Sequence, residues 1–295
     1  MAKLISIVIP AYNEERVIPE LGRRIQSVTN SIPYSFEIIF VENGSSDRTI
    51  EELFILRKKD KRFKIVVLPK NVGCDNGIMA GLTYAKGDAI IIMMADLQEP
   101  PELIGKFIKK WEKGYDIVYA VVKKREDLTF IRRVEIYIFY KVMGFLSHGT
   151  IIENSSDFRL IDRKVNDALL RMPEHGKFFR GIVMWTGFKK VGIQFDRAPR
   201  FAGKSKAYFG TVATIAINAL FGFSNAPHQF QWILLFVSLL VAVASLFFQS
   251  FTQHFVFLIL ILINITILIQ NQYLVRILEE ARNRPQFMVS ETHGI

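Results

Sequence analysis

The 295-residue sequence contains a single cysteine, Cys74. A lone thiol cannot close an intramolecular disulfide or build a multi-thiolate metal site, so a disulfide-stapled secreted scaffold and a zinc module are excluded. The turns discussed below contain no glycine triplet of the dinucleotide-binding type and no lysine-bearing phosphate loop. Half of the residues are hydrophobic and 22% are charged, a composition that excludes a disordered or fibrous chain.

Acidic and basic residues are missing from one long stretch of the chain. No Asp, Glu, Lys or Arg occurs between Ala207 and Val275, whereas charged residues recur every few positions before it. Lys and Arg number 38 against 28 Asp and Glu, which gives a formal net charge of +10. We therefore expect two unlike parts, a charged domain over residues 1–205 and an apolar C-terminal part.

The apolar part contains two nearly continuous hydrophobic runs, Trp232–Phe248 and Phe255–Val275. Each is close to the roughly 17–25 residues that a tilted helix needs to cross a bilayer. Only Gln249–His254 connects them, so we predict a hairpin of two transmembrane helices over residues 231–276. The alternative, a pair of buried core helices, would need a much larger soluble body to cover them.

Basic residues flank this hairpin and indicate its orientation. They lie before it and directly after it, at Arg276, Arg282 and Arg284. By the positive-inside rule, we expect a multi-pass protein of the inner (cytoplasmic) membrane, with the N-terminal domain and both termini in the cytoplasm and residues 277–295 as a cytoplasmic tail. The hairpin could support a homo-oligomer, although no heptad or small-residue motif sets the number of copies.

Two further segments have compositions typical of helices on a membrane surface. Tyr208–Phe223 is uncharged but short, so we expect an interfacial helix within residues 206–230, with a third membrane crossing as the alternative. Phe130–Leu146 mixes arginine and lysine with aromatic and aliphatic residues, which favours another interfacial helix at about 130–147. An ordinary amphipathic core helix would show the same pattern.

The charged part alternates short β-branched runs with helix-like segments. The expected strands are Leu4–Pro10, Phe36–Glu42, Phe63–Leu68, Asp88–Met94 and Tyr115–Val122. The expected helices between them are Glu14–Val28, Asp47–Lys59, Asn76–Ala85 and Pro101–Lys113. This alternation predicts an α/β fold, Rossmann-like, with a mainly parallel sheet and helices on both of its faces.

Ligands of such sheets bind just beyond the carboxyl ends of the strands, which directs attention to the turns that follow them. Four of these turns are polar: Ala11–Glu14, Glu42–Ser45, Asn71–Gly73 and Ala95–Gln98. Surface loops of any α/β protein are polar too, so this pattern alone does not identify a site.

At these turns the sequence closely resembles family 2 glycosyltransferases of the GT-A fold, and among them the polyprenyl-phosphate sugar transferases, the group of bactoprenol glucosyltransferases and dolichol-phosphate mannose synthases. The matching stretches are Val8–Glu15, Val41–Asp47, Ala95–Glu102, Asp157–Arg163 and Arg200–Lys206. The resemblance covers essentially the whole chain, including the C-terminal hairpin. It implies a nucleotide-sugar donor, a membrane-bound isoprenoid phosphate acceptor and inversion at C1 of the sugar.

The resemblance also implies roles for individual residues. The donor site would be formed by Pro10, Tyr12, Glu14, Glu42, Asn71, Gly73 and Asp96. Catalysis would depend on Asp96, Gln98 and Asp157, of which Asp157 lies in the motif that faces the acceptor and the reacting sugar. The acceptor phosphate would be bound by Arg125, Arg133, Arg200 and Lys206. Non-specific attraction to anionic lipid would also explain such basic residues.

The expected cofactor is Mg²⁺ or Mn²⁺, held by Asp96 and Gln98, and the metal motif departs from the family pattern. The family commonly has Asp-x-Asp where this chain has Met94-Ala95-Asp96. A thioether is a poor ligand for these hard cations, so Met94 is not a ligand. One or two carboxylates with substrate phosphates can hold Mg²⁺, so Asp96 can suffice. The alternative is a site that binds without catalysing.

The sequence therefore favours transfer of a hexose, first glucose from UDP-glucose, to undecaprenyl or a related polyprenyl phosphate. A lipid phosphate is already ionised at neutral pH, so the reaction needs orientation and charge stabilisation more than a strong base. The alternatives are a GDP-mannose-dependent mannosyltransferase and a non-catalytic membrane partner that binds nucleotide sugars. The expected partners are the donor, the lipid and the membrane, and no nucleic acid.

Overall fold

The computed structural model describes residues 3–123, 152–172, 178–199, 220–247 and 252–295, together with residues 141, 144, 174, 201 and 217. The strands are β1 (Leu4–Ala11), β2 (Ser35–Asn43), β3 (Phe63–Leu68), β4 (Ala89–Ile92), β5 (Ile117–Val122), β6 (Ser155–Asp162), β7 (Lys190–Phe195) and β8 (Glu291–His293). The helices of the sheet domain are α1 (Ile18–Asn30), α2 (Thr49–Lys59), α3 (Cys74–Tyr84), α4 (Ile104–Trp111), α6 (Arg163–Arg171) and α7 (Phe179–Trp185), and the 3-10 turn η1 (Pro101–Leu103) precedes α4.

These strands form one sheet in the order β7-β5-β6-β4-β1-β2-β3-β8. Neighbouring strands are parallel except where β6 pairs with β4 and β5 and where β8 pairs with β3. The strand order reverses between β1 and β4, so the carboxyl ends of these two strands open a crevice at which α/β proteins bind ligands. The predicted α/β fold with a mainly parallel sheet is confirmed.

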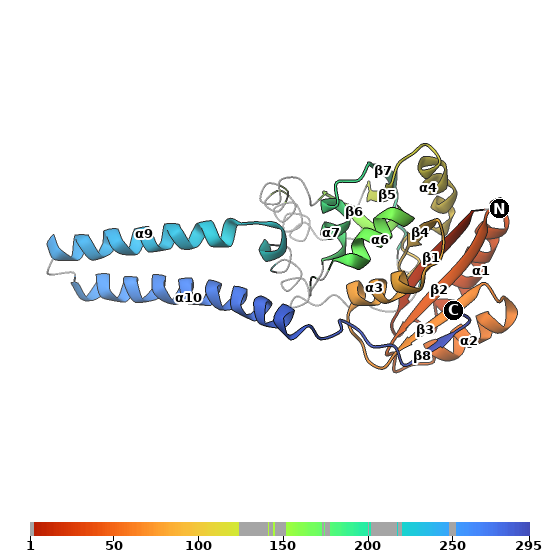
Figure 1. Ribbon diagram of the computed structural model, residues 1–295, viewed down its shortest axis with the longest axis horizontal. Helices are drawn as coiled ribbons and strands as arrows, with labels where there is room; N and C mark the ends of the chain where they lie inside the picture. Colours follow the sequence, from red (N-terminus) through yellow and green to blue (C-terminus); the bar gives the residue numbers. More distant parts are fainter. Residues whose placement is uncertain are drawn as a thin grey trace.

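Helices cover both faces of the sheet, as the alternating sequence predicts (Figure 1). On one face, α1, α2 and α4 bury residues such as Leu21, Leu53 and Phe107 against the strands. On the other face, α3, α6 and α7 do the same with residues such as Ile78 and Val165. Because the central strands are covered on both faces, their sequences are almost continuously apolar, as β4 (Ala-Ile-Ile-Ile) illustrates.

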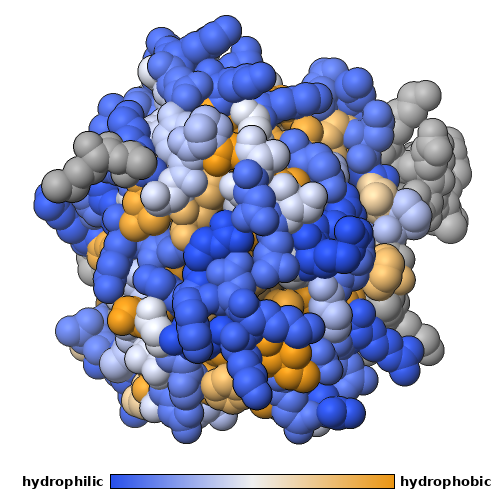
Figure 2. All heavy atoms as spheres, turned by 90° about the vertical axis from the view of Figure 1, so that its right-hand side faces the viewer, coloured by the Kyte–Doolittle hydropathy of each residue, from blue (hydrophilic) through white to orange (hydrophobic). Residues whose placement is uncertain are grey.

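The apolar C-terminal part forms two long helices, α9 (Ala226–Phe247) and α10 (Thr252–Arg282), which lie side by side and project from the sheet domain (Figure 1). Both are long and apolar enough to cross a membrane, and only 11% and 6% of their most apolar windows are buried. Leu246 and Phe247 are 73% and 77% exposed. The alternative of two buried core helices therefore does not describe this structure. The opposite end of the molecule is mostly hydrophilic (Figure 2).

The C-terminal residues differ from the simple tail expected after residue 276. α10 continues to Arg282, and the chain then returns to the sheet domain, where β8 pairs antiparallel with β3. The Ser290 amide donates to the Val67 carbonyl at 2.9 Å. The Phe54 and His293 rings meet edge to face, with 4.8 Å between their centroids. The sheet thus includes both the first and the last secondary-structure element of the chain.

Two expected elements cannot be compared with the structure. The interfacial helix expected at about 130–147 lies outside the described residues, apart from Lys141 and Gly144. Within the segment 206–230, the structure describes residue 217 and residues 220–230, and a helical turn at 220–223 precedes α9.

A buried polar cluster joins three strands to the turn between α3 and β4. The Glu37 carboxylate accepts from the Ser6 hydroxyl at 2.5 Å, the Lys64 ammonium at 2.7 Å and the Lys86 amide at 2.6 Å. The Ser6 hydroxyl oxygen in turn accepts from the Gly87 amide at 2.8 Å. Burial would raise the pKa of Glu37, but hydrogen bonds from Lys64, Ser6 and the Lys86 amide outweigh this effect and lower it. The charged carboxylate therefore stabilises the fold.

We expect Glu37→Gln to lower the free energy of unfolding at pH 7 by about 1.5–3 kcal/mol, because the charged hydrogen bond to Lys64 is lost. The lowered pKa means that this contribution is present above pH 4.5, the ordinary pKa of Glu, and is lost as the pH falls through the folded-state value. Urea unfolding of both proteins from pH 7 down to pH 3 measures it. Exposed Glu51, paired with Arg48, supplies the control Glu51→Gln, with an effect below about 1 kcal/mol. A difference between wild type and Glu37→Gln that does not change with pH would contradict this explanation.

Candidate functional site

The turns that follow β1, β2 and β3 are joined by side chain to backbone hydrogen bonds. The Asn13 amide donates to the Ser45 hydroxyl at 3.0 Å, and the Asn13 side-chain oxygen accepts from the Ser46 amide at 2.8 Å. Buried Asn43 accepts from the Val72 amide and donates to the Gly73 carbonyl, both at 3.0 Å. The three turns therefore form one continuous edge, as expected for the carboxyl ends of parallel neighbours.

Glu42 is buried at the end of β2 and holds its own turn in shape. Its carboxylate accepts from the Ser45 amide at 2.6 Å and the Gly44 amide at 3.2 Å. Gly44 has φ of +67°, and a Cβ at this position would come within 2.5 Å of the Lys70 carbonyl carbon. Glu42, one of the predicted donor-binding residues, therefore also fixes the backbone of the second turn.

The other predicted donor residues lie along the same edge. Pro10 is buried near the end of β1, and Tyr12 and Glu14 follow in the first turn with half-buried side chains. The Asn71 side-chain oxygen accepts a hydrogen bond from the Gly73 amide at 2.8 Å. Gly73, with φ of +85°, is the N-cap residue directly before α3. The structure thus brings together Pro10, Tyr12, Glu14, Glu42, Asn71 and Gly73, and their contact with a donor stays a prediction.

The loop after β4 carries Asp96 and Gln98 to this edge. Asp96 is half-buried, and its Oδ1 accepts from the Gln98 amide at 3.2 Å. The Gln98 side-chain oxygen accepts from the Arg197 guanidinium at 2.7 Å, and the Ala198 amide donates to the Gln98 carbonyl at 3.2 Å. The segment after β7 therefore packs on this loop, and Arg197 is not among the residues to which the sequence points.

Asp96 offers an oxygen ligand of the kind that Mg²⁺ and Mn²⁺ prefer. The Met94 sulfur lies 3.8 Å from the Cys74 sulfur. Where the family usually has its first aspartate, this chain therefore has two sulfur atoms in contact and no oxygen ligand. Among the described residues, no group of three His, Cys, Asp or Glu side chains could hold a metal ion. The residues present fit a cation that draws its remaining ligands from substrate phosphates and water, with Gln98 as a second candidate ligand.

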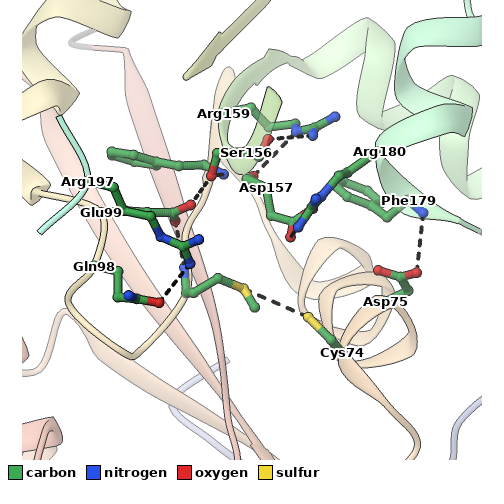
Figure 3. A network of polar contacts seen from close by, with 12 residues as sticks. Cys74, Asp75, Gln98, Glu99, Ser156, Asp157, Arg159, Phe179, Arg180 and Arg197 are labelled. Atoms are coloured by element: carbon green, nitrogen blue, oxygen red, sulfur yellow. Dashed lines mark hydrogen bonds and ion pairs between the residues drawn. The ribbon is translucent and has the colours of Figure 1, made fainter. Parts of the chain in front are cut away.

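Asp157 lies at the start of β6, which runs antiparallel beside β4 and so brings this residue to the same edge (Figure 3). Arg180, the second residue of α7, donates to both of its oxygens, at 2.7 and 2.5 Å. Burial would raise the pKa of Asp157, but the charge and hydrogen bonds of Arg180, with the charges of Arg159 and Arg197, hold it below its ordinary value. Asp157 is therefore a carboxylate at neutral pH.

Two other acidic side chains respond to this charge. Glu99 is buried, its carboxylate accepts from the Ser156 hydroxyl and it lies 3.4 Å from the Met94 amide (Figure 3). Burial, followed by the charges of Asp157 and Asp96, raises the pKa of Glu99 to about 8. Burial and the charge of Asp157 raise the pKa of Asp75, which accepts from the Phe179 amide at 3.4 Å, to about 7. Both carboxyl groups therefore hold their protons more readily than exposed Asp and Glu side chains do.

Arg159 is fully buried beside Asp157 on β6. It donates to the Ser156 carbonyl at 2.7 Å and the Asp157 carbonyl at 3.3 Å, and its guanidinium lies over the Phe179 ring at 5.4 Å. Burial lowers the pKa of Arg159 to about 10, so it stays charged at neutral pH. Its Nη1 has no hydrogen-bond partner among the described residues.

Several site residues are not evident from the sequence. Arg180 lies 23 positions from Asp157, too far for helix or strand periodicity to predict their contact. Glu99 is marked in the sequence only as part of a motif at the start of a helix. Four predicted acceptor residues, Arg125, Arg133, Arg200 and Lys206, lie outside the described residues.

Residues 6–170 match the family described as Glycosyl transferase family 2. An uncharacterized glycosyltransferase from Synechocystis sp. is 35% identical over 99% of this chain and 96% of its own length. The SfII prophage-derived bactoprenol glucosyl transferase of Shigella flexneri is 31% identical, with 98% of both chains covered. These relatives align with the hairpin as well as with the sheet domain.

Solved structures show the same fold. Glucosyl-3-phosphoglycerate synthase from Mycobacterium tuberculosis, in complex with Mn²⁺, uridine diphosphate and phosphoglyceric acid, has a TM-score of 0.54 and 15% identity, and the match covers 74% of this chain and 79% of that one. The same enzyme with Mg²⁺ and uridine diphosphate has a TM-score of 0.52 and 14% identity, with the same coverage. The predicted GT-A fold of the sheet domain is confirmed.

We expect Gly44→Ala to weaken nucleotide binding, because its Cβ would meet the Lys70 backbone and separate the second turn from the third. If the displacement costs about 1.4 kcal/mol of binding free energy, the affinity falls by about tenfold. Calorimetric titration with UDP and GDP measures it. Gly114→Ala is a matched control, since Gly114 has φ of +81° and a Cβ added there would meet nothing within 4 Å. Equal effects of both substitutions would show that backbone strain, not this contact, is responsible.

Proposed function

Because this chain belongs to glycosyl transferase family 2, we propose that it transfers a hexose from a nucleotide sugar to a polyprenyl phosphate at a membrane surface. The observation that carries the proposal is that the donor-side turns and the Asp157–Arg180 pair share one edge of a sheet whose chain continues into an apolar hairpin. The bactoprenol glucosyl transferase of Shigella flexneri, similar over nearly its whole length, supports this acceptor class. Glucose from UDP-glucose and undecaprenyl phosphate are the first substrates to test.

In the proposed reaction, an oxygen of the lipid phosphate attacks C1 of the sugar while the bond from C1 to the nucleoside diphosphate breaks, with inversion. The nucleophile is already an anion, so no residue has to remove a proton. Charged Asp157 accepts a hydrogen bond from the sugar and balances positive charge that develops at C1. Arg180 and Arg159 keep that carboxylate ionised and limit its repulsion of the incoming phosphate.

The leaving diphosphate would be held on the other side of the site. Asp96, with Gln98 as the second candidate, would hold Mg²⁺ or Mn²⁺, and such a cation neutralises charge that develops on the leaving group. Arg197 contacts Gln98 and brings a guanidinium to the same loop. The turns with Tyr12, Glu14 and Glu42 would contain the nucleoside, at the crevice beside β1.

We propose a location at the inner membrane with both termini on the cytoplasmic side, and the sheet supports the part of this proposal that places both ends of the hairpin on one side. β7 precedes the hairpin and β8 follows it, and both belong to the same sheet, so the chain between them crosses a membrane an even number of times. The pair α9 and α10 satisfies this condition. Crossing by residues 208–223 as well would make three passes, so this geometry favours the interfacial alternative for that segment.

The proposal is tested by formation of lipid-linked sugar. Purified full-length protein in detergent is incubated with undecaprenyl phosphate, Mg²⁺ or Mn²⁺ and radiolabelled UDP- and GDP-sugars. We expect organic-extractable label from one donor, abolished by EDTA and reduced at least about tenfold by Asp96→Asn, which corresponds to about 1.4 kcal/mol of barrier. Asp167→Asn, at an exposed carboxylate on α6, is the matched control.

The outcomes separate the alternatives. Label from GDP-mannose with competition by GDP, and none from UDP-glucose, would identify the mannosyl reaction. If no donor gives labelled lipid although calorimetry shows that the protein binds nucleotide, the proposed enzymatic activity is contradicted and a non-catalytic membrane partner is favoured. Met94, in place of the usual first aspartate, would then explain the missing activity.

The Asp157–Arg180 pair makes the reaction pH-dependent in a defined direction. Arg180 lowers the pKa of Asp157, so Arg180→Gln raises it and moves the acidic limb of the kcat profile to higher pH. The rate of lipid-linked sugar formation at saturating substrate from pH 4.5 to 8.5 measures the shift. Arg23→Gln removes a similar two-bond pair with Glu20 on the exposed face of α1 and should leave the profile unchanged. An unshifted limb in Arg180→Gln would show that Asp157 does not control it.

A further inference from the structure

The helical turn at residues 220–223 lies between the hairpin and the sheet domain. On its hairpin side, the Phe221 ring meets the Tyr273 ring of α10 edge to face, with 5.0 Å between the centroids. The Arg276 guanidinium lies over the same Phe221 ring at 5.3 Å. This turn is therefore attached to α10 as well as to α9, which begins three residues after Phe223.

On its other side, the turn packs against α7. The Phe223 ring lies 6.3 Å from the Phe178 ring, at the residue that precedes this helix. A Cβ added at Gly181 would come within 2.6 Å of two Phe223 ring carbons. The ring occupies the space that a side chain at position 181 would fill, so glycine is needed here for close approach.

The same seven-residue helix holds the charged network of the site (Figure 3). Arg180, adjacent to Gly181, donates to both oxygens of Asp157. The Phe179 amide reaches Asp75, and the Phe179 ring lies against the Arg159 guanidinium. A displacement of α7 would therefore move the groups that orient and ionise Asp157.

We propose that Phe223 and Gly181 are positioning residues that couple the hairpin to the Asp157–Arg180 pair, and so set where this carboxylate lies relative to the membrane. The inference rests on the proposed function, because the lipid phosphate must meet the sugar at a depth that the membrane dictates. Phe221 contacts Tyr273 on α10, Phe223 contacts α7, and the backbone of one helical turn joins Phe221 to Phe223. Neither Phe223 nor Gly181 touches a reacting group; both act through Arg180.

The test uses two single variants and one compensating pair in the full-length protein. Phe223→Ala removes the ring, and Gly181→Ala forces it away from α7. In the double variant Gly181→Ala with Phe223→Leu, the smaller side chain leaves room for the added methyl group. Exposed Phe230 on α9 supplies the control Phe230→Ala.

We expect both single variants to lower kcat for lipid-linked product by roughly 10- to 100-fold, as small misplacements of catalytic groups do. The nucleotide dissociation constant should stay within about twofold of wild type, well below the tenfold change that corresponds to 1.4 kcal/mol. The acidic limb of the kcat profile should move to higher pH, as in Arg180→Gln. The compensating double variant should recover much of the activity lost in Gly181→Ala, and Phe230→Ala should behave as wild type.

Loss of thermal stability in the single variants, with kcat and the acidic limb unchanged in the folded fraction, would overturn the proposal and leave an ordinary packing contact. Failure of the double variant to improve on Gly181→Ala would also overturn it. Hydrogen exchange of residues 179–185 adds a measurement that needs no activity, and faster exchange in Phe223→Ala is expected. If wild type forms no lipid-linked product, the proposed function fails by itself, and unchanged exchange in Phe223→Ala would then overturn the coupling as well.

Discussion

The structure depends on the balance of charge around one buried carboxylate. Asp157 is removed from water, and this alone would favour its neutral form. Arg180 reverses that preference through two hydrogen bonds and its charge, with help from Arg159 and Arg197. Burial, and after it the charge of Asp157, makes two nearby carboxyl groups harder to ionise and raises the pKa values of Glu99 and Asp75 to about 8 and 7. Burial and this ion pair together determine which carboxyl groups at this edge carry charge at neutral pH.

Much of the sheet domain follows from sequence patterns. The five strands expected before residue 123 are present, as are the helices between them, because short apolar runs separated by polar turns leave few other ways to bury the strands. Residues of the polar turns also meet at one edge as expected, since parallel strands end on the same side. Helix ends are less predictable: α1 starts at Ile18, not Glu14, after a turn in which the Glu14 carbonyl accepts from the Val17 and Ile18 amides.

The remaining parts of the site depend on contacts between distant residues. Arg180 lies on a short helix with no periodic signal of its own, and its partner is on a strand 23 residues earlier. β8 is three residues long and becomes a strand because the edge of β3 is free to pair with it. The sequence shows that Met94 departs from the family pattern. Only the structure shows that the Met94 side chain packs against Cys74, with their sulfur atoms in contact.

The pairing of β8 with β3 has a consequence for how the protein is made. Ser290 bonds to Val67 across 223 residues of sequence, and the whole hairpin is synthesised between the two strands. Until residues 290–293 leave the ribosome, β3 is an open sheet edge, the kind of surface that pairs with foreign strands. The sheet can close only after both long apolar helices have been made, so completion of the domain follows hairpin synthesis. A ribosome that stalls before residue 290 would leave β3 without its partner strand, so this edge of the sheet stays open until the hairpin has been made.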